Sequence, residues 1–211
     1  MVVPQNGRQI PPAAYGSDLG FIWKPFPRLL VNAAAWYLWL EQEFVYMGDE
    51  GVVELSGESR RTSLDLSLRY QLTRFLFADV NVSAAKPRAL GVTEVENYLP
   101  LAPTLTSTGG LSVQELGRFS GSVRYRYLAD RAANENRSLV AESYFVTDLQ
   151  MNYFFKRQQI SLSVQNLFDT RWKETQFATE SQLQNETEPV NEIYFTPGTP
   201  FFARLGWSFF W

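Results

Sequence analysis

Hydrophobic and polar residues alternate along much of this chain, most clearly in its last eleven residues, 201–211. The apolar set is Phe201, Ala203, Leu205, Trp207, Phe209 and Trp211, and the mixed set is Phe202, Arg204, Gly206, Ser208 and Phe210. Successive residues of a β-strand point to opposite faces, so the pattern predicts a strand with one apolar face. The ends of soluble proteins are usually frayed. Lipid can cover such a face in an outer-membrane β-barrel.

The same period of two recurs elsewhere, where an amphipathic helix would show a period of 3.6. In residues 63–70 the alternation sets Leu64, Leu66, Leu68 and Tyr70 against Ser63, Asp65, Ser67 and Arg69. We predict nine strands, at residues 15–24, 29–46, 63–70, 76–84, 104–113, 122–127, 145–155, 160–165 and 201–211. The fifth contains Gly109 and Gly110, which indicate a bulge or a bend.

The connections between these strands alternate in length. Short connections are residues 24–28, 71–74, 114–117 and 156–158, and long ones are residues 48–58, 85–103, 129–143 and 169–200. Short turns on the periplasmic side and long loops outside are typical of up-and-down membrane barrels. The sequence therefore predicts an all-β fold, a portion of an antiparallel up-and-down transmembrane β-barrel with about nine strands.

An odd number of strands does not fit a complete single-chain bacterial barrel, which has an even number. We therefore expect residues 15–211 to be the C-terminal portion of a longer barrel, and an open sheet in which 15–24 and 201–211 are unpaired edges. Residues 1–14 contain Pro4, Gly7, Pro11 and Pro12, which argue against another strand. They show no signal-peptide pattern and are interpreted as an irregular remnant of an extracellular loop.

The composition excludes several classes of function. The chain has no cysteine and no histidine, which excludes disulfides, thiolate chemistry, histidine-dependent catalysis and the usual zinc or haem sites. A formal charge of −3 with scattered cations gives no basic stripe for nucleic acid. No run of 18 apolar residues predicts a transmembrane helix. We expect no catalytic residues, no metal site and no cofactor.

Charged residues on the polar side of the strands are candidates for the barrel lumen. They are Asp65, Arg69, Asp79, Arg124, Arg126 and Asp148. They would form a polar channel or a wall that contacts a plug. The alternative is that they only solvate the wall and pair across strands.

The long connection at 169–200 is the candidate ligand-contact loop. Long loops often carry function, and Trp172, Phe177 and Tyr194 are its candidate contact residues. The alternative is an acidic, solvated loop. Glu41 and Glu43 are two residues apart, but rim solvation explains them better than glycosidase chemistry does. A membrane-interface belt is the interpretation of Trp36, Trp39, Trp207 and Trp211.

Two stretches near the end of the chain resemble a known family. Residues 161–169 end in Asn166-Leu-Phe-Asp169, and residues 197–204 hold a Pro-Gly turn that leads into a last strand ending in an aromatic residue. On these residues the chain resembles the TonB-dependent outer-membrane receptors over about residues 15–211. Shorter stretches that look similar are residues 48–51, 59–61, 124–127, 130–131 and 133–135.

The resemblance implies a receptor for energised uptake of a scarce ligand in the outer membrane of a Gram-negative bacterium. Siderophore-bound iron, cobalamin and carbohydrate are the ligand classes it implies. The family's plug domain and TonB-contacting box have no counterpart in these residues, so TonB is expected to act only through that missing part. The other implied partners are outer-membrane lipid, a small-molecule ligand and the barrel-assembly machinery. That machinery would recognise the last strand through Leu205, Trp207, Phe209 and Trp211.

Two alternatives remain open at the level of the sequence. A small self-contained barrel, porin-like or adhesin-like, requires one more strand in residues 2–14 and closure of the sheet. A soluble β-sheet protein requires that a core bury the apolar side chains of the strands, namely Leu64, Leu66, Leu68, Val80 and Val82.

Overall fold

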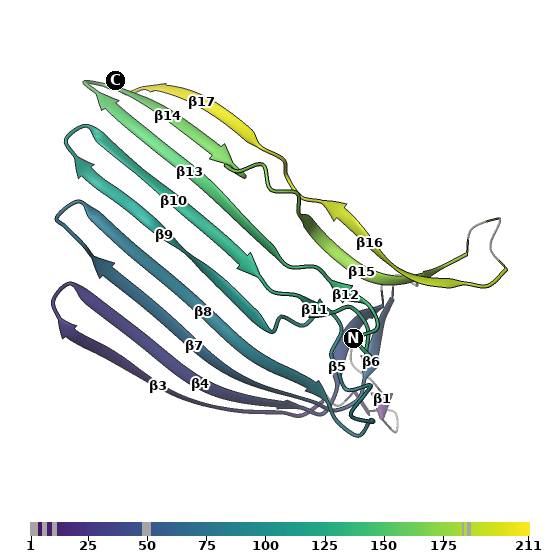
Figure 1. Cartoon of the computed structure of the whole chain (residues 1–211). Coiled ribbons are helices and arrows are strands. Elements are labelled where there is room, and N and C mark those ends of the chain that lie inside the picture. Colours follow the sequence, from purple (N-terminus) through teal and green to yellow (C-terminus); the bar gives the residue numbers. More distant parts are fainter. Residues whose placement is uncertain (1–3, 6–7, 10–11, 48–51, 183, 185–186) are drawn as a thin grey trace.

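Nine long antiparallel strands form one open, curved sheet in the computed structural model of the chain (Figure 1). The structure describes residues 4–5, 8–9, 12–47, 52–182, 184 and 187–211. In spatial order the strands are β3 (Ala14–Phe26), β4 (Leu29–Leu40), β7 (Ser59–Gln71), β8 (Leu76–Ala89), β9 (Leu105–Leu116), β10 (Phe119–Leu128), β13 (Tyr144–Phe155), β14 (Gln158–Gln165) and β17 (Phe202–Phe209). Within the described residues β3 and β17 each pair on one side only. The predicted open sheet of nine strands is confirmed.

Four short hairpins accompany the sheet. They pair β1 (Pro4–Gln5) with β2 (Arg8–Gln9), β5 (Glu43–Met47) with β6 (Val52–Ser56), β11 (Arg131–Ala132) with β12 (Val140–Ala141), and β15 (Lys173–Ser181) with β16 (Val190–Pro197). Figure 1 shows the last three at the end of the sheet opposite the short turns. We call these two ends of the sheet the loop end and the turn end.

The strand predicted at residues 29–46 is wrong in its extent. β4 ends at Leu40, where its pairing with β7 also ends, at Ser59. After a break at Glu41 and Gln42, β5 pairs with β6 in a separate hairpin. A continuous alternation of polar and apolar residues cannot reveal such a change of partner, because both strands share the same period.

The N-terminal segment adds no strand to the main sheet within its described residues. Of residues 1–14, the described ones form the β1–β2 hairpin and the start of β3 at Ala14. Their origin as a loop remnant stays a prediction. The similar stretch at residues 48–51 lies outside the described residues. In the part of the chain that the structure describes, no helix is long and apolar enough to cross a membrane.

The main sheet has one polar and one apolar face, which follow from the strand register. On β7, Ser63 and Asp65 lie on one face, and Leu64 and Leu66 lie on the other. Residues directly opposite on antiparallel neighbours share a face, so Leu66 joins Ala33 and Val82 on the apolar face. We name these the polar face and the apolar face.

The apolar face is largely exposed, and this contradicts the soluble alternative. Leu64 is 66% exposed and Leu205 is 75% exposed, and Leu66 and Val80 are also exposed. Buried side chains are found instead at or near the loop end, and they include Leu99, Ala132, Ala141, Val146 and Asn166. The strands therefore do not build a core between two layers, as a soluble sandwich would.

Candidate functional site

The six candidate lumen residues lie on the same face of the sheet. Arg69, Asp79, Arg124 and Asp148 form one row across it, with Gly110 between Asp79 and Arg124. Asp65 lies opposite Ser83, and Arg126 lies opposite Thr108, on the same polar face. The register thus brings together residues that lie up to 83 positions apart in the sequence. That this face lines a lumen stays a prediction.

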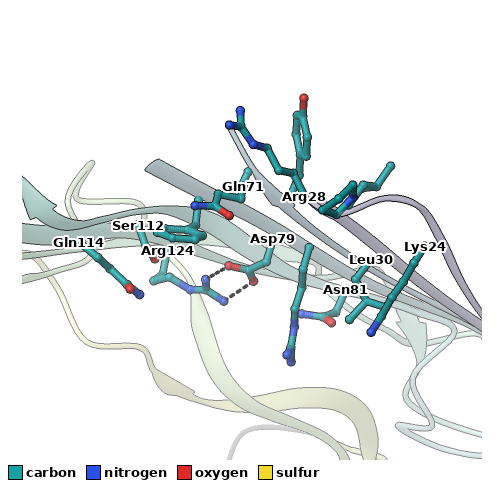
Figure 2. A pocket seen from close by; sticks show the side chains of 15 residues that line it. Lys24, Arg28, Leu30, Gln71, Asp79, Asn81, Ser112, Gln114 and Arg124 are labelled. Atoms are coloured by element: carbon teal, nitrogen blue, oxygen red, sulfur yellow. Dashed lines mark hydrogen bonds and ion pairs between the residues drawn. The ribbon is translucent and has the colours of Figure 1, made fainter. Parts of the chain in front are cut away.

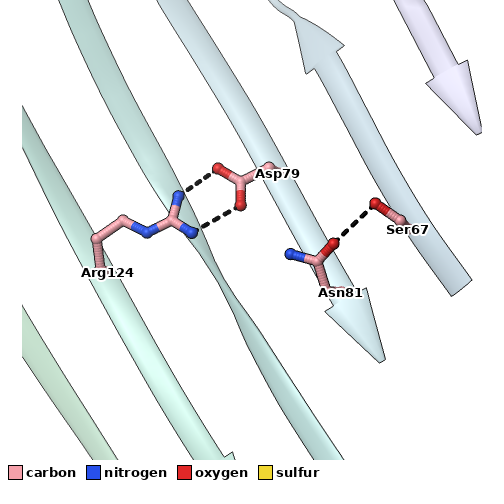
Figure 3. Close-up of polar contacts among 4 residues, drawn as sticks. All are labelled: Ser67, Asp79, Asn81 and Arg124. Carbon is pink, nitrogen blue, oxygen red and sulfur yellow. Dashed lines mark hydrogen bonds and ion pairs between the residues drawn. The ribbon is translucent and has the colours of Figure 1, made fainter. Parts of the chain in front are cut away.

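Arg124 and Asp79 form the central ion pair of this row (Figure 3). Arg124 donates one hydrogen bond from each of its terminal nitrogens to the two carboxylate oxygens of Asp79, and Nη2 lies 2.8 Å from Oδ2. Planar, two-point contacts of this kind fix both partners in orientation. Arg126 and Asp148 make a longer contact of 3.5 Å, and their side chains are 50% and 34% exposed.

Two glycines on β9 make room for side chains of β10. Gly110 lies opposite both Asp79 and Arg124, so the guanidinium crosses β9 where no side chain stands. On the apolar face, a Cβ at Gly109 would lie 2.9 Å from the ring of Tyr125. The bulge considered at these glycines is absent, because pairing to β8 and β10 continues without a register shift through both residues.

Asp65 is the centre of a second polar cluster. Its carboxylate accepts hydrogen bonds from Trp36 Nε1 at 2.8 Å, from Ser63 at 3.1 Å and from Ser83 at 2.6 Å. Trp36 therefore lies on the polar face, and its assignment to a membrane belt is wrong. Trp39, an odd number of residues away, lies on the apolar face against Tyr15, with ring centroids 5.5 Å apart.

A hollow of about 630 Å³ opens on the polar face toward the turn end (Figure 2). Lys24, Arg69 and the Asp79–Arg124 pair are among the residues that line it. Cations outnumber carboxylates around the hollow, because Arg28 also lines it and Asp79 is its acidic residue. Among the described residues, neither Lys24 nor Arg69 makes an ion pair. The arrangement favours an anionic or strongly polar occupant.

At the loop end, Asn166 fastens the two ends of the 169–200 connection together. Its buried side chain donates to the carbonyl oxygens of Thr170 at 2.9 Å and of Thr199 at 3.0 Å, and it accepts from Thr170 N at 2.9 Å. Asp169 Oδ1 accepts from Phe201 N at 3.0 Å. The Asn-Leu-Phe-Asp stretch therefore holds the base of the β15–β16 hairpin against the start of β17.

Trp172 lies at that base and contacts the polar face. Its ring centroid is 4.9 Å from that of Tyr144, Arg126 lies over it at 5.7 Å, and its Nε1 donates to Thr199 O at 3.0 Å. A neighbouring cavity of about 390 Å³ is lined by Trp172, Lys173 and Phe195 among others. Lys173 Nζ lies 4.6 Å from the Phe195 ring and 2.9 Å from Glu142.

The three predicted ligand-contact residues do not form one cluster. Phe177 lies opposite Tyr194 along the β15–β16 hairpin, and Trp172 precedes the hairpin at its base. Sequence reasoning missed Tyr144 and Lys173, because the contacts that join them to the site arise only from tertiary pairing. Glu41, considered for paired-carboxylate chemistry, instead accepts a hydrogen bond from Ala13 N at 2.7 Å. The side chain of Glu43 lies outside the described residues.

One family model matches the chain over residues 11–167, and its description is TonB dependent receptor-like, beta-barrel. The chain belongs to this family. The match includes eight of the nine strands of the main sheet in full, since β3 begins at Ala14 and β14 ends at Gln165. The family is one of receptors, in agreement with the prediction that the chain is not an enzyme. None of the curated protein sequences compared with the chain matches it.

Solved receptors share the fold. The ferric-catecholate import receptor Fiu of E. coli K12, in its closed form, matches with a TM-score of 0.69 and 21% identity over 98% of this chain and 29% of its own. The siderophore receptor PiuA of Acinetobacter baumannii matches with a TM-score of 0.70 and 17% identity over 98% and 30%. The copper transporter OprC matches with a TM-score of 0.65 and 21% identity over 91% and 31%. The chain spans less than a third of the length of these receptors.

Proposed function

We propose that the chain forms the C-terminal wall of a TonB-dependent receptor in the outer membrane of a Gram-negative bacterium. The apolar face meets lipid, and the polar face lines the lumen. The observation that carries the proposal is the pair of opposite faces on one continuous sheet, in a chain whose family model describes receptor barrels.

The ligand of the proposed receptor is a small molecule that is captured at the loop end. The base of the β15–β16 hairpin supports this role, because Trp172, Tyr144 and Arg126 combine aromatic surface with a cation there. Of the three ligand classes implied by the resemblance, siderophore-bound iron agrees best with the functions of Fiu and PiuA. Phe177 and Tyr194 extend the contact surface along the hairpin.

The proposed partners act at different parts of the receptor. TonB engages the part of the receptor that lies outside these residues. The barrel-assembly machinery recognises the last strand, where Leu205, Trp207 and Phe209 share the apolar face and Trp211 follows the end of β17. Leu205 and Trp207 are 75% and 71% exposed on this edge strand, so their side chains are accessible to a partner.

The alternative of a small self-contained barrel has no specific observation in its favour. It requires β3 and β17 to pair, and within the described residues they are opposite edges of an open sheet. Exposed strand edges promote aggregation. We therefore expect the isolated chain to be poorly soluble unless further strands complete the barrel.

The mass of the species that carries this C-terminus tests the proposal. An antibody against residues 169–200 is applied to isolated outer membranes after electrophoresis. A band several times heavier than the chain supports a wall of a larger receptor. A heat-modifiable band at the chain's own mass contradicts the proposal and favours the self-contained barrel.

A further inference from the structure

The turn end of the sheet is strongly basic. The four short turns and their flanking residues hold six cations, Lys24, Arg28, Arg74, Arg118, Lys156 and Arg157, against one carboxylate, Glu115. All six cations are exposed. The whole chain has a formal charge of −3, so the turn end is opposite in sign to the rest of the molecule.

These six cations have no acidic partner among the residues that the structure describes. The ion pairs of the described residues involve Arg124, Arg126 and Lys173, none of which lies in a short turn. No hydrogen bond is donated by any of the six side chains within the described residues. Like charges held together without a counterion repel one another, so the arrangement favours an anion from outside the chain.

Two of the cations converge on one aromatic ring. The Arg118 guanidinium carbon lies 5.6 Å from the centroid of the Phe155 ring, and Lys156 Nζ lies 5.4 Å from it. Phe155 is two residues from Tyr153, and both belong to the apolar face, together with Ile160 on β14. Arg118 and Lys156 therefore sit where the apolar face ends, on the side away from the proposed lumen.

We propose that the turn end binds the headgroups of anionic phospholipids on its apolar side, through a site formed by Arg118, Phe155 and Lys156, which we call the basic rim. The inference rests on the proposed function, because it requires the apolar face to lie in a membrane. Aromatic side chains settle at the level of the headgroups, and long basic side chains extend from there to the charged surface. An acidic segment inside the lumen could not reach the site, since Phe155 lies on the opposite face.

Spin-labelled lipids test the rim directly. The receptor that contains this chain is inserted into phosphatidylcholine vesicles, and electron spin resonance compares the immobilised fraction of labelled phosphatidylglycerol with that of labelled phosphatidylcholine. The chain is expected to prefer phosphatidylglycerol. In the R118Q/K156Q variant each lost cation should lower headgroup affinity at the site about fivefold, the ratio that corresponds to ~1 kcal/mol.

Two controls separate the rim from general charge attraction and from misfolding. Arg204→Gln removes one cation, half the charge change of the double variant, from the polar face of β17 opposite Ser163, and should leave the preference unchanged. The charge-conserving R118K/K156R variant should retain it. The inference is overturned if the chain shows no preference, if R118Q/K156Q keeps it, or if Arg204→Gln lowers it equally.

The same sample distinguishes failure of the inference from failure of the proposed function. A receptor that inserts, with these strands protected from protease, yet shows no headgroup preference overturns only the rim. A receptor that inserts while these strands remain open to protease overturns the membrane wall and, with it, the rim.

Discussion

Arg124 on β10 reaches across β9 to pair with Asp79 on β8, because Gly110, the residue opposite both, has no side chain (Figure 3). An ion pair between next-nearest strands ties three strands together at one point. On the other face Tyr125 occupies the space above Gly109, and its hydroxyl hydrogen-bonds Ser107 at 2.9 Å. The two adjacent glycines are thus covered from opposite sides.

A side chain at position 110 should break this arrangement. Gly110→Val places methyl groups in the path of Arg124 and against the Val123 carbonyl oxygen. We expect it to lower the free energy of unfolding by roughly 1–3 kcal/mol, measured by urea titration in detergent micelles. Thr108→Val, two residues away on the same face, is the control and should change stability little. Equal stability of Gly110→Val and the parent chain would show that the space is not needed.

The Asp79–Arg124 pair should show measurable coupling. In a double-mutant cycle with Asp79→Asn and Arg124→Gln, we expect a coupling energy of about 1 kcal/mol, which salt should reduce. The same cycle for Asp148 and Arg126, whose contact is 3.5 Å and more exposed, should give less. Equal coupling for the two pairs would contradict the role assigned to the two-point contact.

Asn166 should control the order of the 169–200 connection. Asn166→Ala removes three hydrogen bonds from a buried site and places alanine at a φ of 49°. We expect a loss of about 1–3 kcal/mol and faster proteolysis within the β15–β16 hairpin. Asn166→Gly tolerates this φ, so its difference from Asn166→Ala isolates the backbone strain. Gln165→Ala, at the exposed neighbouring position, is the control and should leave the cleavage rate unchanged. If Asn166→Ala is cleaved as slowly as this control, the hydrogen bonds of Asn166 do not hold the base of the hairpin.

Adjacent residues of β7 should differ sharply in their tolerance of charge. Leu66→Arg places a cation near the middle of the apolar face and should oppose membrane insertion by ~2–4 kcal/mol. Ser67→Arg introduces the same side chain on the polar face, where Ser67 bonds Asn81 at 2.7 Å, and should cost far less. Folding yield in vesicles measures both. Similar yields for the two variants would mean that the faces do not meet different environments.

The sequence predicted the strands well because each strand has one polar and one apolar face, which imposes the period of two. Ser63 and Leu64 show this pattern without any knowledge of neighbouring strands. Partners remote in sequence could not be predicted in the same way. Arg124 lies 45 residues from Asp79, and Asn166 bonds Thr199 33 residues away. A local pattern of residues carries no information on contacts between positions so far apart in the sequence.

The errors have equally specific causes. Trp36 and Trp39 were grouped by residue type, although an odd separation places them on opposite faces. Gly109 and Gly110 were interpreted through backbone flexibility, whereas the side chains of Tyr125 and Arg124 explain them. The Asn-Leu-Phe-Asp stretch was recognised by its resemblance to a family, but its role as a clamp required the coordinates of Thr199 and Phe201.

The most direct test of the account is a cysteine scan along β7, which is possible because the chain has no cysteine of its own. Single cysteines at positions 60–70 are labelled in the membrane-inserted protein with a water-soluble thiol reagent. The account predicts reaction at alternate positions. Cysteines that replace Ser63, Asp65 and Ser67 should be labelled, and those that replace Leu64, Leu66 and Leu68 should be protected by lipid. Labelling that is uniform along the strand, or protection of both faces, would contradict a barrel wall with water on one face and lipid on the other.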